Sequence, residues 1–146
     1  MKRLSWKYIA GLIDGEGCLD VQVHNNYIRP RVRIGMADSA KTLLDIMHTN
    51  HGGFLSGRPS KNEKWQSSTC WELAGYSKAC PFLRNIVNHL LLKHEQARLL
   101  LWMETTLKGK QVSNEIRAIV RDELKAMKRD PHRLSDSAQE RILTLL

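Results

Sequence analysis

Residues 9–17, IAGLIDGEG, decide the fold of this chain. They begin as a helix, because Ser5 is a suitable N-cap and the residues from Trp6 to Ile13 supply two mostly apolar turns. Gly15 and Gly17 follow, and glycine can adopt the backbone angles that end a helix. We therefore predict a helix over residues 6–13 that is ended by glycines.

Two acids, Asp14 and Glu16, lie at the C-terminal end of this helix, where the helix dipole is negative. No Lys or Arg lies within five residues downstream to compensate them. Ala10, Gly11 and Gly15 leave one side of the helix nearly bare, so another backbone can approach it closely. A helix side without large side chains, ending in uncompensated acids, predicts an interface with another backbone at which carboxylates are brought close together. An ordinary amphipathic helix would explain neither feature.

The composition is that of one compact and strongly basic domain. The chain has 146 residues, 42% of them hydrophobic, and a net charge of +8. This length is enough for one real core, and the charge favours a polyanionic partner, most commonly nucleic acid. No apolar run reaches the roughly 18 residues of a membrane span, so we expect no membrane partner.

The cysteines and the first residues indicate a protein that stays inside the cell. Cys18, Cys70 and Cys80 are odd in number and lack CxxC spacing, which favours free thiols in a reducing compartment. The first apolar run is too short for a signal peptide and is broken by Asp14. We expect an intracellular, non-secreted protein, either in an organelle (chloroplast or mitochondrion) or encoded by a prokaryote or a phage.

The next two segments are predicted to form a β-hairpin with one polar face. Residues 18–24 alternate between polar and apolar, Asn25-Asn26 is a turn signal, and the alternation resumes from Arg29 to Met36. A two-stranded ribbon fits the major groove of DNA, where Arg pairs with guanine and Gln with adenine. A solvated face would explain a single Arg, but three at period two favour DNA contact. The polar side chains proposed to contact DNA here are Asp20, Gln22, His24, Arg29, Arg31 and Arg33.

A second helix and two more strands are predicted to extend this surface. The helix runs from Asp38 to about His48 and ends at His51-Gly52-Gly53; the strands cover residues 53–58 and 65–73. The loop over residues 59–64 carries two Lys that are placed to touch phosphates. In the last strand Thr69, Trp71 and Leu73 face the core. The polar face adds Ser56, Arg58, Ser68, Cys70 and Glu72 to the proposed DNA contacts.

The rest of the chain is predicted to be helical. Helices are expected over residues 77–91, 94–107 and 113–129, and a last one begins at Ser135 or Ser137 and ends at Leu146. The outer helices are basic. Either they flank the DNA backbone or they are simply solvated, and both alternatives stand.

The stretch at residues 9–17 closely resembles the signature of the LAGLIDADG homing endonucleases, with Ile9, Gly15 and Glu16 as its three departures. The predicted order of helices and strands is similar to the core of that family over at least residues 5–107. The resemblance implies an α+β fold with an αββαββα core, an antiparallel four-stranded saddle and extra C-terminal helices over about residues 112–146. It also implies that residues 1–146 form a single endonuclease domain.

The resemblance further implies a metal-dependent nuclease that acts on double-stranded DNA. Glu16 takes the place of the acid that binds a divalent metal beside the scissile phosphate, and the Gly15 carbonyl is a second candidate ligand. Mg²⁺ is the expected ion, and other divalent ions such as Mn²⁺ are expected to substitute for it. Because there is one motif, two chains are needed, and the implied homodimer packs through Ala10, Gly11, Asp14 and Gly15. The implied target is a long pseudo-palindromic DNA site.

Two further catalytic residues follow from the same resemblance. Asp38, after the second strand, matches a polar residue that holds solvent near the metal, although it could instead be the N-cap of the second helix. Lys93, in the sequence LKHEQA, resembles the family's basic residue that reaches the phosphate pocket.

Rival functions are weaker. An RNA maturase, or a catalytically inactive DNA-binding protein of the same fold, could discard Glu16 and Lys93, and both residues are present. A sequence-specific DNA-binding protein of another fold, such as a transcription factor, would account for the arginines of the hairpin but not for the acids. The pairs His48/His51 and His89/His94 lack a third ligand, so surface histidines are favoured over a metal site.

Overall fold

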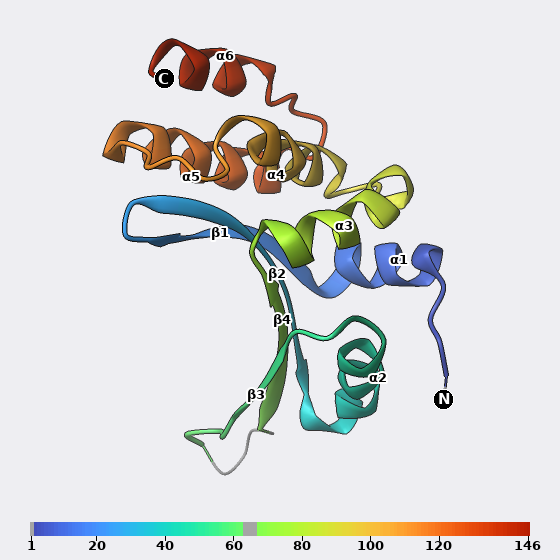
Figure 1. The fold of residues 1–146 in the computed structure, drawn as a ribbon. Coiled ribbons are helices and arrows are strands. Elements are labelled where there is room, and N and C mark those ends of the chain that lie inside the picture. Colours follow the sequence, from blue (N-terminus) through green and yellow to red (C-terminus); the bar gives the residue numbers. More distant parts are fainter. Residues whose placement is uncertain (1, 63–66) are drawn as a thin grey trace.

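The computed structural model describes residues 2–62 and 67–146, and its elements follow the predicted order (Figure 1). The predicted α+β fold with an αββαββα core, a four-stranded antiparallel sheet and extra C-terminal helices is confirmed. The elements are α1 (Trp6–Glu16), β1 (Gly17–His24), β2 (Tyr27–Ala37), the short 3₁₀ turn η1 (Asp38–Ala40), α2 (Lys41–His51), β3 (Phe54–Arg58), β4 (Ser68–Ala74), α3 (Tyr76–Ile86), η2 (Val87–His89), α4 (His94–Thr106), α5 (Asn114–Arg129) and α6 (Asp136–Thr144).

The sheet has the strand order β1-β2-β4-β3 and is strongly bent. Helices α1, α2 and α3 cover one face, and the opposite face is open on the left of Figure 1. The antiparallel register pairs Asp20 with Arg31, and Arg33 with Glu72. Paired residues share a face, so the register gathers these four charges on the open side.

The core lies between the sheet and the helices, and it confirms the alternation expected from the sequence. Leu19, Val32, Ile34 and Trp71 are buried, while their polar neighbours along the strands face the other way. Helices α4 and α5 lie over the β1 end of the sheet (Figure 1). The same hydrophobic cluster extends as far as Ile142 of α6.

The end of α1 differs from the prediction. Ser5 caps the helix as expected, with its Oγ accepting from the Tyr8 N–H at 3.2 Å, but the helix continues to Glu16. Neither Gly15 nor Gly17 has a positive φ. Gly17 is extended, and a Cβ there would lie 2.8 Å from the Ile13 carbonyl oxygen. Gly17 is therefore required for the close approach of β1 to α1, and not for a left-handed turn.

The local turn signals in the sequence are confirmed, whereas the residues at which several helices and strands begin or end differ from those predicted. Asn25 and Asn26 both have positive φ, as a tight hairpin turn requires, and Gly52 ends α2 with φ 72°. Ser113 caps α5 through the Ile116 N–H. The predicted last helix begins after Ser135, but the Oγ of that serine accepts from Gln139 Nε2 and does not cap the helix.

Part of the predicted fourth strand and its loop lies outside the described residues, including Trp65 and the loop residue Lys64. Strand β4 as described begins at Ser68. Among the described residues, no helix combines the length and the apolar character that crossing a membrane requires.

Candidate functional site

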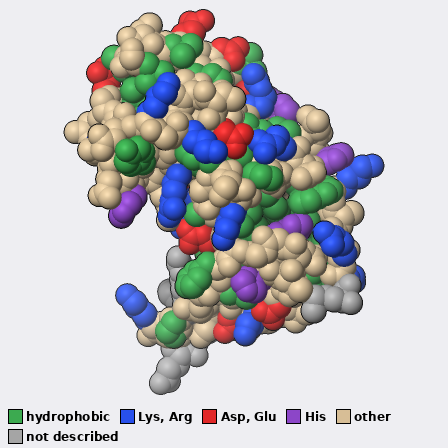
Figure 2. Space-filling view, viewed as in Figure 1, with side chains coloured by type: hydrophobic (Ala, Val, Ile, Leu, Met, Phe, Trp, Pro, Cys, Tyr) green, Lys and Arg blue, Asp and Glu red, His purple; other side chains and the backbone are tan. Residues whose placement is uncertain are grey.

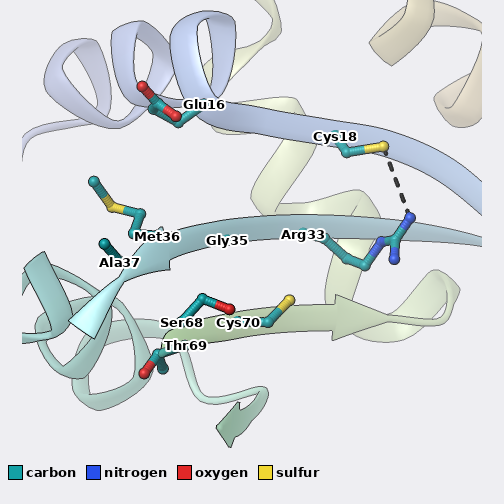
Figure 3. Close-up of a pocket in the computed structure, with 9 residues that line it drawn as sticks. All are labelled: Glu16, Cys18, Arg33, Gly35, Met36, Ala37, Ser68, Thr69 and Cys70. Atoms are coloured by element: carbon teal, nitrogen blue, oxygen red, sulfur yellow. Dashed lines mark hydrogen bonds between the residues drawn. The ribbon is translucent and has the colours of Figure 1, made fainter. Parts of the chain in front are cut away.

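Glu16 is the last residue of α1, and it stands beside the open face of the sheet. Its side chain is exposed and has no hydrogen bond or ion pair within the part of the chain that the structure describes. It lines a hollow of about 350 Å³ together with residues of β1, β2 and β4. Figure 3 shows Glu16 at the helix end, across the hollow from Ser68, Thr69 and Cys70 of β4.

Asp14 has a different role from the one predicted. Its carboxylate accepts hydrogen bonds from the backbone N–H groups of Leu91 at 2.7 Å, Leu92 at 3.1 Å and Lys93 at 3.0 Å. These N–H groups precede α4 and need acceptors. The carboxylate at position 14 is therefore not uncompensated as predicted, because N–H groups from a distant segment satisfy it within the chain. Its assignment to a dimer interface stays a prediction.

The bare side of α1 is narrower than predicted. Ala10 is fully buried in the core, because it lies about 100° around the helix from Gly11; its assignment to an interface is wrong. Gly11 and Gly15 are exposed, and a Cβ added to either would have no atom within 4 Å. The open stripe of α1 is therefore formed by Gly11 and Gly15, with the half-exposed Tyr8 beside them.

Lys93 and Asp38 lie close to this end of α1, through different contacts. Lys93 Nζ donates to the Asp14 carbonyl oxygen at 2.8 Å, so its ammonium group reaches the backbone two residues before Glu16. Asp38 Oδ1 accepts from Thr69 Oγ1 at 2.8 Å, and Thr69 lines the hollow beside Glu16. Asp38 makes no capping hydrogen bond, so the alternative that it caps the second helix is wrong.

The arginines of β2 are paired within the chain, which the sequence did not predict; their predicted contact with DNA stays a prediction. Arg31 binds Asp20 through two hydrogen bonds of 2.8 Å, and Arg33 Nη2 lies 2.7 Å from the same carboxylate. Arg31 Nη1 also lies 3.4 Å from Glu72 Oε1. The hydrogen bond to Asp20 raises the pKa of Arg31 above its ordinary value. We call Asp20, Arg31, Arg33 and Glu72 the sheet-face charge network.

Two hydrogen bonds of the uncharged Gln22 side chain extend the network toward the hairpin. Gln22 Nε2 donates to Glu72 Oε1 at 3.2 Å, and Gln22 Oε1 accepts from Arg29 Nε at 3.1 Å. His24, at the end of β1, is exposed. The space-filling view shows this side of the molecule hollowed, with Lys and Arg side chains along its edges (Figure 2).

The polar residues of β3 and β4 are less uniform than predicted. Ser56 and Ser68 are half-buried. Cys70 is only 8% exposed and forms part of the wall of the hollow beside Glu16, so its predicted DNA contact stays a prediction with little exposed surface to support it. The side chain of Arg58 lies outside the described residues.

One neighbour of the site had no signal in the sequence. Lys128, at the end of α5, places its Nζ 3.6 Å from Cys18 Sγ, two residues after Glu16. In sequence it is one of several lysines on a basic helix, and no spacing rule singles it out.

The described residues of one chain provide only part of a site for a hard divalent cation. The Glu16 carboxylate has oxygens that no protein group occupies in the described chain, and oxygen ligands are what Mg²⁺ prefers. However, the described residues contain no cluster of three His, Cys, Asp or Glu side chains that could hold a metal. A second copy of Glu16 would supply the missing carboxylate.

Comparisons with known proteins agree on the fold. No protein-family model and no curated protein matches the sequence. Homing endonuclease I-CvuI, in complex with the I-CreI target in the presence of Mg, matches with a TM-score of 0.67 and 19% identity over 96% of this chain and 93% of that one. LAGLIDADG homing endonuclease I-GzeII in complex with its DNA target matches with a TM-score of 0.60 and 17% identity over 99% of this chain, which spans 50% of I-GzeII. With IAGLIDGEG on α1, these matches establish that the chain has the fold of the LAGLIDADG homing endonucleases.

Proposed function

We propose that this protein is a homodimeric, divalent-metal-dependent endonuclease that cuts both strands of a long, pseudo-palindromic double-stranded DNA site. The observation that carries the proposal is the unpaired Glu16 at the end of the open glycine stripe on α1. One chain has one such acid, and the stripe offers the surface through which a second chain brings another.

The stripe supports close pairing of two helices. With nothing within 4 Å of a Cβ at Gly11 or Gly15, a second α1 can approach backbone to backbone. Tyr8, Leu91 and Leu92 are exposed by 52%, 80% and 51%, and Asp14 ties Leu91 and Leu92 to the end of α1. Exposed apolar side chains around a glycine stripe favour burial against a partner.

The pairing explains why acids are useful at this position. Two Glu16 carboxylates at a two-fold axis repel each other unless cations neutralise them. Glu16 and the Gly15 carbonyl would hold Mg²⁺, or Mn²⁺ in its place; bound there, such an ion supplies water activation and neutralises charge at the scissile phosphate. In this proposal Lys93, whose Nζ reaches the Asp14 carbonyl, contacts a phosphate oxygen. Asp38, which accepts a hydrogen bond from Thr69, holds solvent near the metal.

The open sheet face provides the DNA surface. The net charge of +8 suits a polyanion, the sheet-face charge network holds arginine donors in fixed positions, and two strands of such a sheet fit the major groove. I-CvuI and I-GzeII, which share the fold, are in complex with DNA targets.

The test compares wild type with Glu16→Gln on a pool of long duplexes, with Mg²⁺ and with EDTA. We expect cleavage by wild type only with Mg²⁺, and a loss of at least about a hundredfold in Glu16→Gln, since even outer-shell changes at metal sites cost about 10–100-fold. Glu140→Gln, exposed on α6, is the matched control and should cut normally. Specific binding by wild type without any nicking would favour an inactive DNA binder or a maturase instead.

A further inference from the structure

A second hollow lies behind the candidate metal acid, where the start of β1 meets the start of α4 and the end of α5. Its volume is about 380 Å³, and its polar lining consists of Cys18, Lys93, Gln96 and Lys128. Cys18 also lines the hollow of Glu16. The two hollows are therefore neighbours along β1.

The two lysines bring positive charge that the protein leaves without a counter-ion. Neither Lys93 nor Lys128 has a carboxylate within 4.0 Å among residues 2–62 and 67–146. Lys93 Nζ donates to the Asp14 carbonyl, and Lys128 Nζ contacts Cys18 Sγ. An ammonium group has three donors, so each lysine keeps donors for a ligand. Two cations that share one hollow favour an anion between them.

The backbone does not compete for that anion. The N–H groups of Leu91, Leu92 and Lys93, which precede α4, already donate to Asp14. Binding of an anion in the hollow therefore depends on side chains. Among the C-terminal helices, α5 supplies one of them, Lys128.

The buried side chain of Gln96 indicates that the second hollow contains water. Its side chain is 2% exposed, and its Oε1 is buried with no hydrogen-bond partner among the described residues. A buried acceptor without a donor is costly, and a water in the hollow would supply one. The second hydrogen of that water can bond to an oxygen of an anion held by the lysines.

We propose that this hollow binds a backbone phosphate of DNA, with Lys128 as a second phosphate-contacting lysine beside Lys93. The inference rests on the proposed function, because it takes DNA as the partner. It also assigns a role to α5, which carries Lys128 to within 3.6 Å of Cys18 and so places a cation beside the strand that follows Glu16.

Cys18 provides a local reporter that does not need cleavage. It is half-buried, whereas Cys70 and Cys80 are buried, and burial raises the pKa of Cys80 to about 12. Iodoacetamide should therefore modify Cys18 first. Mass spectrometry follows the rate at which iodoacetamide alkylates Cys18. The rate is compared between sodium phosphate and sodium chloride of equal ionic strength, both without divalent metal. Salt-dependent binding to a short duplex is measured in parallel.

The variants are Lys128→Met and, as control, Lys125→Met, which changes an exposed lysine of the same helix. We expect phosphate to slow Cys18 modification severalfold in wild type and Lys125→Met but not in Lys128→Met. Lys128→Met should also reduce the slope of log affinity against log salt by about 0.9 for each chain bound, the loss of one phosphate contact per chain.

Each other outcome overturns the proposal. Equal protection in Lys128→Met shows that Lys128 does not hold the phosphate, and no protection in wild type shows that the hollow binds none. Protection by phosphate with an unchanged DNA salt slope assigns the hollow to free phosphate and removes DNA as its ligand. This test measures no cleavage. The phosphate-binding proposal can therefore succeed or fail independently of the Glu16→Gln test of nuclease activity.

Discussion

At the scale of single residues, the two acids of the IAGLIDGEG stretch have separate tasks. Asp14 is used within the chain, where it accepts from three backbone N–H groups before α4. Glu16, two residues later, has no partner in the described chain. The first acid fixes the segment that carries Lys93, and the second stays available for a ligand.

Replacing Asp14 should therefore affect both stability and the site. Asp14→Ala leaves three N–H groups without their acceptor, and we expect the free energy of unfolding to fall by about 2 kcal/mol. Urea denaturation measures the change. Asp14→Asn, which keeps one acceptor oxygen, should lose less. A variant Asp14→Ala as stable as wild type would show that water replaces the carboxylate at no cost.

At the scale of elements, α1 has a packed side and an empty side. Ile9, Ala10 and Ile13 are fully buried, while Gly11 and Gly15 face open space. Within one chain the empty side has no structural purpose, since larger residues would fit there. We therefore expect its purpose to be contact with a second chain.

Gly15→Leu tests this face. A monomer should unfold with an unchanged free energy or one raised by up to about 1 kcal/mol, because Leu favours a helix over Gly. Self-association, measured by sedimentation velocity, should be lost because the added side chain keeps the backbones apart. Ser137→Leu, exposed on α6, is the control. Dimers of normal affinity in Gly15→Leu would rule out this interface.

The sheet-face charge network limits what its arginines can do. Asp20 engages both Arg31 and Arg33, so the acid orients the guanidinium groups and restrains their attraction to phosphates. An oriented donor is better suited to selecting a base than to holding any backbone.

Asp20→Asn should accordingly raise non-specific affinity and reduce selectivity. Removing the carboxylate frees donors of two arginines, and each added phosphate contact steepens the salt slope by about 0.9. Fluorescence anisotropy with a random duplex measures both quantities. Asp122→Asn, exposed on α5, makes the same change of charge. If the two variants bind alike, net charge and not the network accounts for the effect.

At the scale of the whole molecule, one chain provides half of the proposed site. Its described residues hold no three-ligand metal cluster, and the chain covers about half of the larger I-GzeII. If the proposed nuclease site is shared between two chains, association has to precede catalysis.

The cleavage rate should therefore rise more steeply than linearly with protein concentration. Below the dissociation constant of the dimer, the rate per chain should fall on dilution, because monomers lack the second Glu16. Rates over a dilution series measure this. Two copies joined by a flexible linker should keep their rate, since the linker raises the effective concentration. A constant rate per chain in samples that sediment as monomers would contradict the dimeric site.

Much of the architecture was determined by the sequence itself. The caps at Ser5 and Ser113, the Asn25-Asn26 turn and the alternation along β1 and β2 all depend on residues within a few positions of one another. Local geometry and the burial of one face are enough to specify them. The same short stretch placed Glu16 beside the C-terminal end of this helix, although the helix extends three residues further than predicted and includes Glu16.

The partners of the charged side chains were decided only by the tertiary structure. Asp14 meets Leu91 across 77 residues of sequence, and Lys128 meets Cys18 across 110. The sequence shows the charge of Arg31 and Asp20, but only the strand register brings them together. Charges interact through space and not along the chain, so packing determines which carboxylate is used internally and which stays free.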